Sequence, residues 1–129
     1  FTAITCIDWL GAALARLAEL EFPSPYRYDT HGHLRVILDR PLTFGGLASV
    51  ALEQIRSYAA ENVAVYVGLI EALTAVVPHV HRSEDRLVLA HHAALIRQSG
   101  TTDLREGADR EQVDRLCGEL IALLAEGDG

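Results

Sequence analysis

Histidines are the side chains whose type and number most invite a chemical role in this sequence. The six are His31, His33, His79, His81, His91 and His92. His91 lies ten residues beyond His81, which is about 15 Å along a helix and too far for one coordination sphere. His91 and His92 are adjacent, so their side chains point about 100° apart on a helix and cannot easily bind one ion together. His31 and His33 could share one face of a strand, but they lack a third ligand. We therefore predict no metal site.

Asp8 is the acidic residue with the strongest case for binding. It lies opposite the apolar stripe of a predicted helix, beside Ala12 and Ala15, and small residues let another element approach a carboxylate closely. One reading is that this face docks on a partner or ligand through Asp8. The other is an ordinary solvated helix face.

Arg56 follows Glu53 by three residues, so the two can pair along a helix surface. Alternatively, its planar guanidinium clamps a carboxylate or phosphate.

The segment "TFGG", residues 43–46, could admit an anion to a helix N-terminus or simply allow close packing. A further hypothesis is a small-molecule pocket lined by four aromatic residues: Trp9, Tyr26, Tyr28 and Phe44. No nucleophile elbow, P-loop or dinucleotide fingerprint is present, so we predict no catalytic residue and no cofactor.

The elements that must position these residues are five helices and one hairpin, which makes the fold mainly α. The helices are expected up to about Glu21, from Phe44 to Ala60 after a Thr43 cap, from Val63 to about Val77 after an Asn62 cap, from a Ser83 cap to a C′ glycine at Gly100, and from about Arg110 to Glu126. A short β-hairpin ended by Pro41 fits between the first two helices and should pack on them, because a lone hairpin is marginal in water.

Apolar residues at helical spacing are expected to face the core. They are Cys6, Ile7, Leu10, Leu14 and Leu17 in the first helix, and Leu47, Ala51, Ile55 and Tyr58 in the second. The third helix is apolar almost all round and should be central. Cys6 and Cys117 are expected as two buried thiols.

The bulk composition describes a globular, acidic chain. Its 129 residues carry a net charge of −7, and half of them are apolar. All eleven basic residues are arginines, scattered along the chain, so we exclude general nucleic-acid binding. The most apolar window carries Glu71 and Pro78, so we expect no direct membrane insertion.

Several short motifs together resemble a family of uncharacterised, predicted bacterial inner-membrane proteins. In that family a signature A-L-S-P-G/A-I-N-D-P-x-T-A precedes a helix, and Phe1, Thr2 and Ala3 correspond to its tail. Asp8 matches an acidic position of that helix, and residues 26–32, Phe44, Leu47 and residues 53–58 match further on, so the resemblance covers most of residues 1–60. It implies that residues 1–129 are one soluble domain, a fragment of a longer membrane protein on the cytoplasmic face of the bacterial inner membrane.

Two functions follow as expectations. The first is a non-catalytic assembly, regulatory or ligand-sensing module that forms a homo-oligomer or docks on its own transmembrane and upstream region. Its binding or docking candidates are Thr2, Asp8 and Arg56. The second is a small hydrolase or metal-dependent enzyme, whose site the missing N-terminal motif would complete and to which Asp8, Arg56 and a histidine would contribute.

Overall fold

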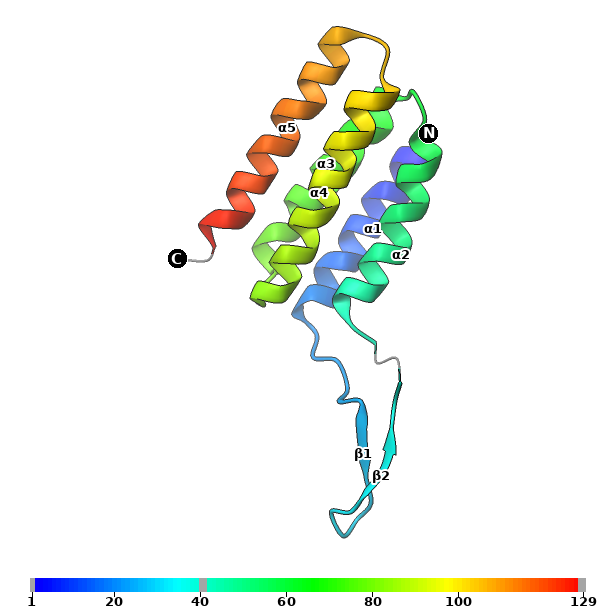
Figure 1. The fold of residues 1–129 in the computed structure, drawn as a ribbon, viewed down its shortest axis with the longest axis vertical. Helices are drawn as coiled ribbons and strands as arrows, with labels where there is room; N and C mark the ends of the chain where they lie inside the picture. Colours follow the sequence, from blue (N-terminus) through cyan, green and yellow to red (C-terminus); the bar gives the residue numbers. More distant parts are fainter. Residues whose placement is uncertain (1, 40–41, 128–129) are drawn as a thin grey trace.

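The computed structural model confirms a five-helix, mainly α architecture with one hairpin between the first two helices (Figure 1). It describes residues 2–39 and 42–127. The elements are α1 (Thr2–Glu19), β1 (Tyr26–Tyr28), β2 (Leu34–Ile37), α2 (Phe44–Ala59), α3 (Val63–Val76), the 3₁₀ turn η1 (Val77–His79), α4 (Ser83–Asp103) and α5 (Gly107–Glu126). Phe1 and Pro41 lie outside the described residues, as does the side chain of Thr2.

Side-chain caps begin two of the helices as predicted. Thr43 Oγ1 accepts a hydrogen bond from the Gly46 amide at 3.0 Å, and Asn62 Oδ1 accepts one from the Ala64 amide at 3.0 Å. The Ser83 cap is wrong, because Ser83 is already the first residue of α4 and no side chain caps that helix. These caps fix where α2 and α3 start, and hence where the loops between helices lie.

The fourth helix continues past its predicted end. Gly100 is not a C′ residue but lies buried inside α4, which runs to Asp103. A Cβ atom on Gly100 would lie 2.7 Å from Val113 Cγ1, so the glycine serves the close approach of α4 and α5. The last helix begins at Gly107, ahead of its predicted start at Arg110.

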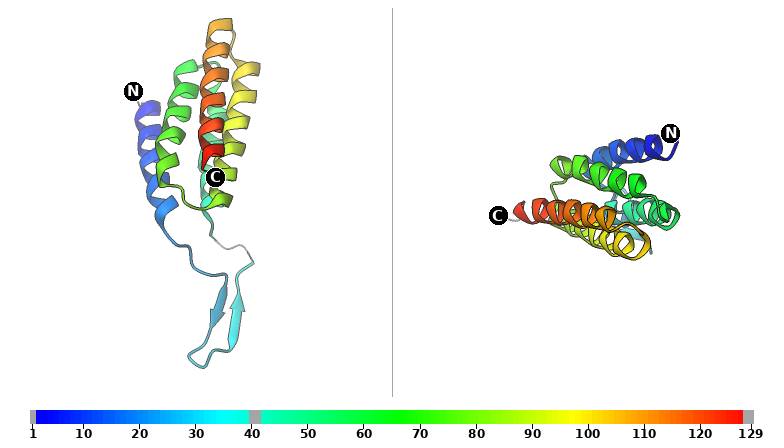
Figure 2. Two further views of the ribbon diagram at one scale, coloured as in Figure 1. Left: turned by 90° about the vertical axis from the view of Figure 1, so that its left-hand side faces the viewer. Right: turned by 90° about the horizontal axis from the view of Figure 1, so that it is seen from above.

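The third helix is central, as its apolar circumference predicts. It packs against each of the other four helices, and views from two further directions show the others around it (Figure 2). Tyr66, Leu69 and Leu73 are at most 1% exposed. The core therefore forms along α3, with α1 on one side and α4 and α5 on the other.

The apolar stripes of the first two helices are only partly predicted. Ile7 and Leu14 are buried as expected, but Cys6 is exposed, whereas Cys117 is buried. In α2 the predicted core residues Leu47 and Tyr58 are exposed. The buried face of α2 consists of Phe44, Ala48, Leu52 and Ala59. The helix thus has two adjacent apolar stripes. The fold buries the stripe that contains Phe44 and Ala48, and it leaves Leu47 and Tyr58 of the other stripe exposed.

The hairpin does not pack on the helices, which contradicts the expectation. It extends beyond the end of the bundle (Figure 1), and every residue of both strands is exposed. Gly32 sits in its turn at φ +80°, a conformation that favours glycine. Asp29 Oδ1 accepts hydrogen bonds from the amides of His31 and His33, each at 2.9 Å. Local hydrogen bonds therefore shape the hairpin without support from the bundle.

Candidate functional site

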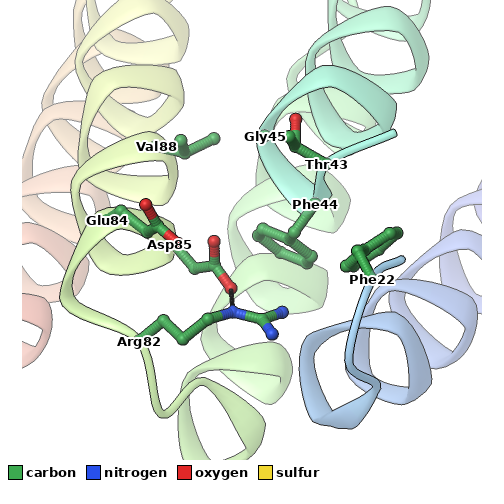
Figure 3. Close-up of a pocket in the computed structure, with 8 residues that line it drawn as sticks. All are labelled: Phe22, Thr43, Phe44, Gly45, Arg82, Glu84, Asp85 and Val88. Carbon is green, nitrogen blue, oxygen red and sulfur yellow. Dashed lines mark hydrogen bonds and ion pairs between the residues drawn. The ribbon is translucent and has the colours of Figure 1, made fainter. Parts of the chain in front are cut away.

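A cavity opens where the hairpin leaves the bundle (Figure 3). It has a volume of about 330 Å³. Its lining comes from the segment after α1, the start of α2 and the start of α4, namely Phe22, Thr43, Phe44, Gly45, Arg82, Glu84, Asp85 and Val88. The cavity thus forms at the meeting point of three chain segments that are far apart in the sequence.

Arg82 is the central polar side chain of this cavity. Its Nε donates to Asp85 Oδ2 at 2.7 Å, and its Nη1 donates to the Leu20 carbonyl at 3.0 Å. The guanidinium lies 5.7 Å from the centre of the Phe22 ring, which is cation–π distance. Arg82 Nη2 is buried and has no hydrogen-bond partner. The two N–H groups of this nitrogen therefore remain available to an acceptor in the cavity.

The electrostatics of the cavity oppose an anion, although it includes three residues of the "TFGG" segment. Glu84 and Asp85 line the same space as Arg82, so the carboxylates outnumber the guanidinium. Gly45 serves packing, since a Cβ there would lie 2.9 Å from Val88 Cγ2. The packing interpretation is therefore supported at Gly45, and it has more support than the anion site.

The predicted aromatic pocket is wrong in its composition. Phe44 lines the cavity, but Trp9, Tyr26 and Tyr28 do not, and all three are exposed. The spacing of three residues between Arg82 and Asp85 is the signal from which their ion pair could have been found. Neither Phe22 nor the backbone of Leu20 carries any comparable signal in the sequence.

Arg56 points toward α4 and does not pair with Glu53 in the described structure. Its Nη1 donates to Ser99 Oγ at 3.0 Å, and its Nε is buried without a partner. On the same interface, His92 Nε2 lies 3.0 Å from Ser49 Oγ. These contacts form a polar seam between α2 and α4, so Arg56 serves the packing of two helices.

His92 makes this seam sensitive to acid. It is 2% exposed. Burial is the main cause that lowers its pKa below the ordinary value of 6.5; His91 and Arg56 lower it further, while Glu53 raises it. Below that ordinary value, the unfolded chain binds a proton that the folded chain does not, so stability falls as pH falls.

We expect the His92→Gln variant to lose less stability in acid than the native chain. Glutamine can still bond to Ser49 but does not titrate. Chemical denaturation between pH 8 and pH 5 measures the difference, which reaches at most about 1.4 kcal/mol per pH unit for one proton. Equal pH dependence in the two proteins would show that His92 is not the acid-sensitive group.

Asp8 lies in a second cavity, between α1 and α3. The cavity has a volume of about 340 Å³, and its lining is Asp8, Gly11, Ala12, Ala15, Glu71, Ala72, Ala75 and His79. The predicted small residues Ala12 and Ala15 do lie beside Asp8. A Cβ on Gly11 would lie 3.1 Å from that of Ala72, so α1 and α3 pack closely here. Asp8 is exposed at this groove, whereas Arg56 lies at the seam between a different pair of helices, α2 and α4.

A third groove, between α1 and α2, is mainly apolar. Its cavity has a volume of about 260 Å³ and is lined by Ala3, Cys6, Ile7, Gln54, Ile55, Tyr58 and Val65. Large apolar side chains stand exposed on the same two helices: Trp9 by 71%, Val50 by 68% and Tyr58 by 83%. Sequence reasoning placed Tyr58 in the core and therefore missed this surface.

Comparison with known proteins decides the family. Residues 1–75, more than half of the chain, match the family described as "Predicted membrane protein (DUF2254)". The chain belongs to this family. No curated protein and no solved structure matches it. Within this DUF2254 chain, the described helices include none that is long and apolar enough to cross a membrane.

The described part of the DUF2254 chain brings no metal-binding group together. Residues 2–39 and 42–127 contain no cluster of three His, Cys, Asp or Glu side chains that could hold an ion. Burial raises the pKa of the Cys117 thiol to about 11, so this cysteine is a protonated core residue at neutral pH.

The family match covers α1, α2 and most of α3, and thus the whole α1–α2 groove.

Proposed function

We propose that residues 1–129 form a non-catalytic assembly domain of a bacterial inner-membrane protein, located on its cytoplasmic face. The observation that carries the proposal is the apolar groove between α1 and α2, with Tyr58 in its lining and with Trp9 and Val50 exposed on the same two helices. Large exposed apolar surfaces bordered by polar residues are typical of protein interfaces. The occupant we propose is the same groove of a second copy.

The shape of the groove supports pairing with itself. Trp9 is a large exposed side chain on α1, three residues after Cys6, which lines the cavity together with Ile55, so Trp9 and Cys6 are neighbours on the helix surface. In a two-fold dimer, each contact is made twice by the same patch. Trp9 of each copy can then fill the cavity of the other, as aromatic anchors do in the centres of interfaces.

The enzyme alternative has less support from the geometry. Asp8 lines the α1–α3 groove beside His79, whereas Arg56 and His92 lie at the α2–α4 seam. Asp8 and a histidine therefore share one groove, but Arg56 lies between a different pair of helices, so the three groups that the alternative requires do not line one cavity. His79 is also engaged, with its Nδ1 2.5 Å from Glu19 Oε1.

We expect the Trp9→Ser variant to dissociate the oligomer. Loss of a central tryptophan from an interface costs about 2 kcal/mol or more, which raises the dissociation constant by roughly thirtyfold. Sedimentation equilibrium over a range of protein concentrations measures this constant, and native mass spectrometry gives the number of subunits.

Leu87→Ser is the matched control. Leu87 is 68% exposed, close to the value for Trp9, but it lies on α4. Its replacement should leave the dissociation constant unchanged. A native chain that stays monomeric at every concentration would contradict the proposal, as would an oligomer that Trp9→Ser does not weaken. Loss of the oligomer in Asp8→Arg alone would move the interface to the α1–α3 groove.

A further inference from the structure

The β1–β2 hairpin has one apolar face. Tyr26 pairs with Ile37 and Tyr28 with Leu34, while Arg27 pairs with Val36. Directly opposed residues lie on the same face of a sheet, and neighbours along a strand alternate between faces. A register shift after Arg27 keeps Leu34 on the face of Ile37. Two tyrosines, a leucine and an isoleucine therefore share one face.

Nothing in the described chain covers this face. Tyr28 and Ile37 are each 61% exposed, and Tyr26 and Leu34 are each 47% exposed. The hairpin extends along the long axis of the molecule, away from the helices, in each view that shows its length (Figures 1 and 2). A two-stranded sheet with an uncovered apolar face is marginal in water, so this face requires an apolar environment.

The charge of the hairpin differs from that of the bundle. Residues 22–39 contain two arginines and two aspartates, so the net charge of −7 lies wholly outside them. One of these pairs is internal, since Arg35 Nε donates to Asp29 Oδ2 at 2.9 Å. The hairpin is therefore the neutral end of an acidic molecule, and its distance from the bundle keeps the acidic surface away from whatever it contacts.

We propose that the apolar face of the hairpin adsorbs to the headgroup level of a lipid bilayer. Tyrosine, which is apolar with one polar end, favours the membrane–water interface. A neutral, arginine-containing hairpin meets no electrostatic barrier at lipid headgroups, and the chain belongs to a family of predicted membrane proteins. The contact is peripheral and crosses no bilayer.

The size of the face favours lipid over a second copy. A stable protein interface uses about 20–30 residues on each side, whereas this face of the hairpin offers four apolar side chains. Weak attachment to a bilayer through a small apolar area is common for peripheral segments, and it adds to whatever else holds the protein at the membrane.

Vesicle flotation of the purified chain tests the proposal. The native chain should float with vesicles of phosphatidylcholine alone, and equally with vesicles that contain an equal part of phosphatidylglycerol. The Tyr28→Ser/Ile37→Ser double variant should bind at least about tenfold more weakly, because two buried apolar side chains are lost. Val36→Ser, on the opposite face, is the matched control and should bind as the native chain does.

A spectroscopic reading locates the contact. Trp9 is the only tryptophan of the chain, so a Trp9→Phe/Tyr28→Trp variant reports on the hairpin alone. Its emission should shift to shorter wavelength when vesicles are added. Circular dichroism of every variant should match the native chain, since the hairpin stands clear of the helices.

Three results would overturn the proposal. The first is no flotation with either vesicle. The second is flotation that the double variant retains. The third is a lipid-free dimer that Tyr28→Ser/Ile37→Ser abolishes and Trp9→Ser does not, which would assign the face to a second copy. The first two results do not depend on the α1–α2 groove, and the third compares the groove with the hairpin directly.

Discussion

Replacement of Arg82 by methionine is expected to lower the free energy of unfolding by about 3 kcal/mol. Asp85, its partner, is 4% exposed, so removal of the guanidinium leaves a buried carboxylate without a counter-charge. The same change removes the bond to the Leu20 carbonyl and the contact with Phe22. These contacts join the end of α1 to the start of α4. Urea denaturation at neutral pH measures the loss.

The matched control for Arg82 is a second arginine–aspartate pair with the same Nε geometry. Arg97 Nε lies 2.5 Å from Asp114 Oδ1, but both side chains are more than two-fifths exposed. Water already solvates such charges, so Arg97→Met should change stability little. Equal losses in the two variants would show that burial of Asp85 does not determine the effect.

The contrast between these two pairs also shows what the sequence could reveal about the site. Three-residue spacing predicts that Arg82 and Asp85 can meet, but exposure decides how much the contact contributes. Exposure depends on Phe22 and Phe44, which reach the cavity from distant segments. The local sequence pattern contains no information about which distant segments contact the Arg82–Asp85 pair, so the cavity could not be predicted.

The fold was largely predictable because its signals are local. Caps at Thr43 and Asn62 mark helix starts through bonds within three residues. The third helix is apolar almost all round, and this pattern predicts its central position. The error in α2 has a different origin. Its two apolar stripes lie side by side, and only the neighbouring helices decide which one is buried. Tyr58, which belongs to the stripe left outside, lines the groove of the proposed interface.

In the hairpin, too, local structure could be predicted from the sequence, but packing could not. Its turn and strands are set by Gly32 and by the bonds to Asp29, all local, and were predictable. The expectation that it packs on helices rested on the need to cover an apolar face. The apolar face still favours burial, but the surface that buries it does not have to belong to the same chain.

Replacement of Gly100 by alanine is expected to destabilise the protein, by about 2 kcal/mol, because the new methyl group overpacks a filled core. Its Cβ would lie 2.7 Å from Cγ1 of Val113, a stiff β-branched residue that is 0% exposed. Alanine gains about 1 kcal/mol in helix propensity over glycine, but the contact between α4 and α5 outweighs that gain.

Gly118→Ala should have the opposite sign, and this difference tests the argument. Gly118 also lies within a helix, α5, but a Cβ there would meet no atom within 4 Å. Only the propensity gain remains, so the free energy of unfolding should rise by about 1 kcal/mol. Thermal denaturation of the two variants compares them directly. If Gly100→Ala also stabilised the protein, glycine at that position would not serve helix packing, and the close approach of α4 to α5 would need another cause.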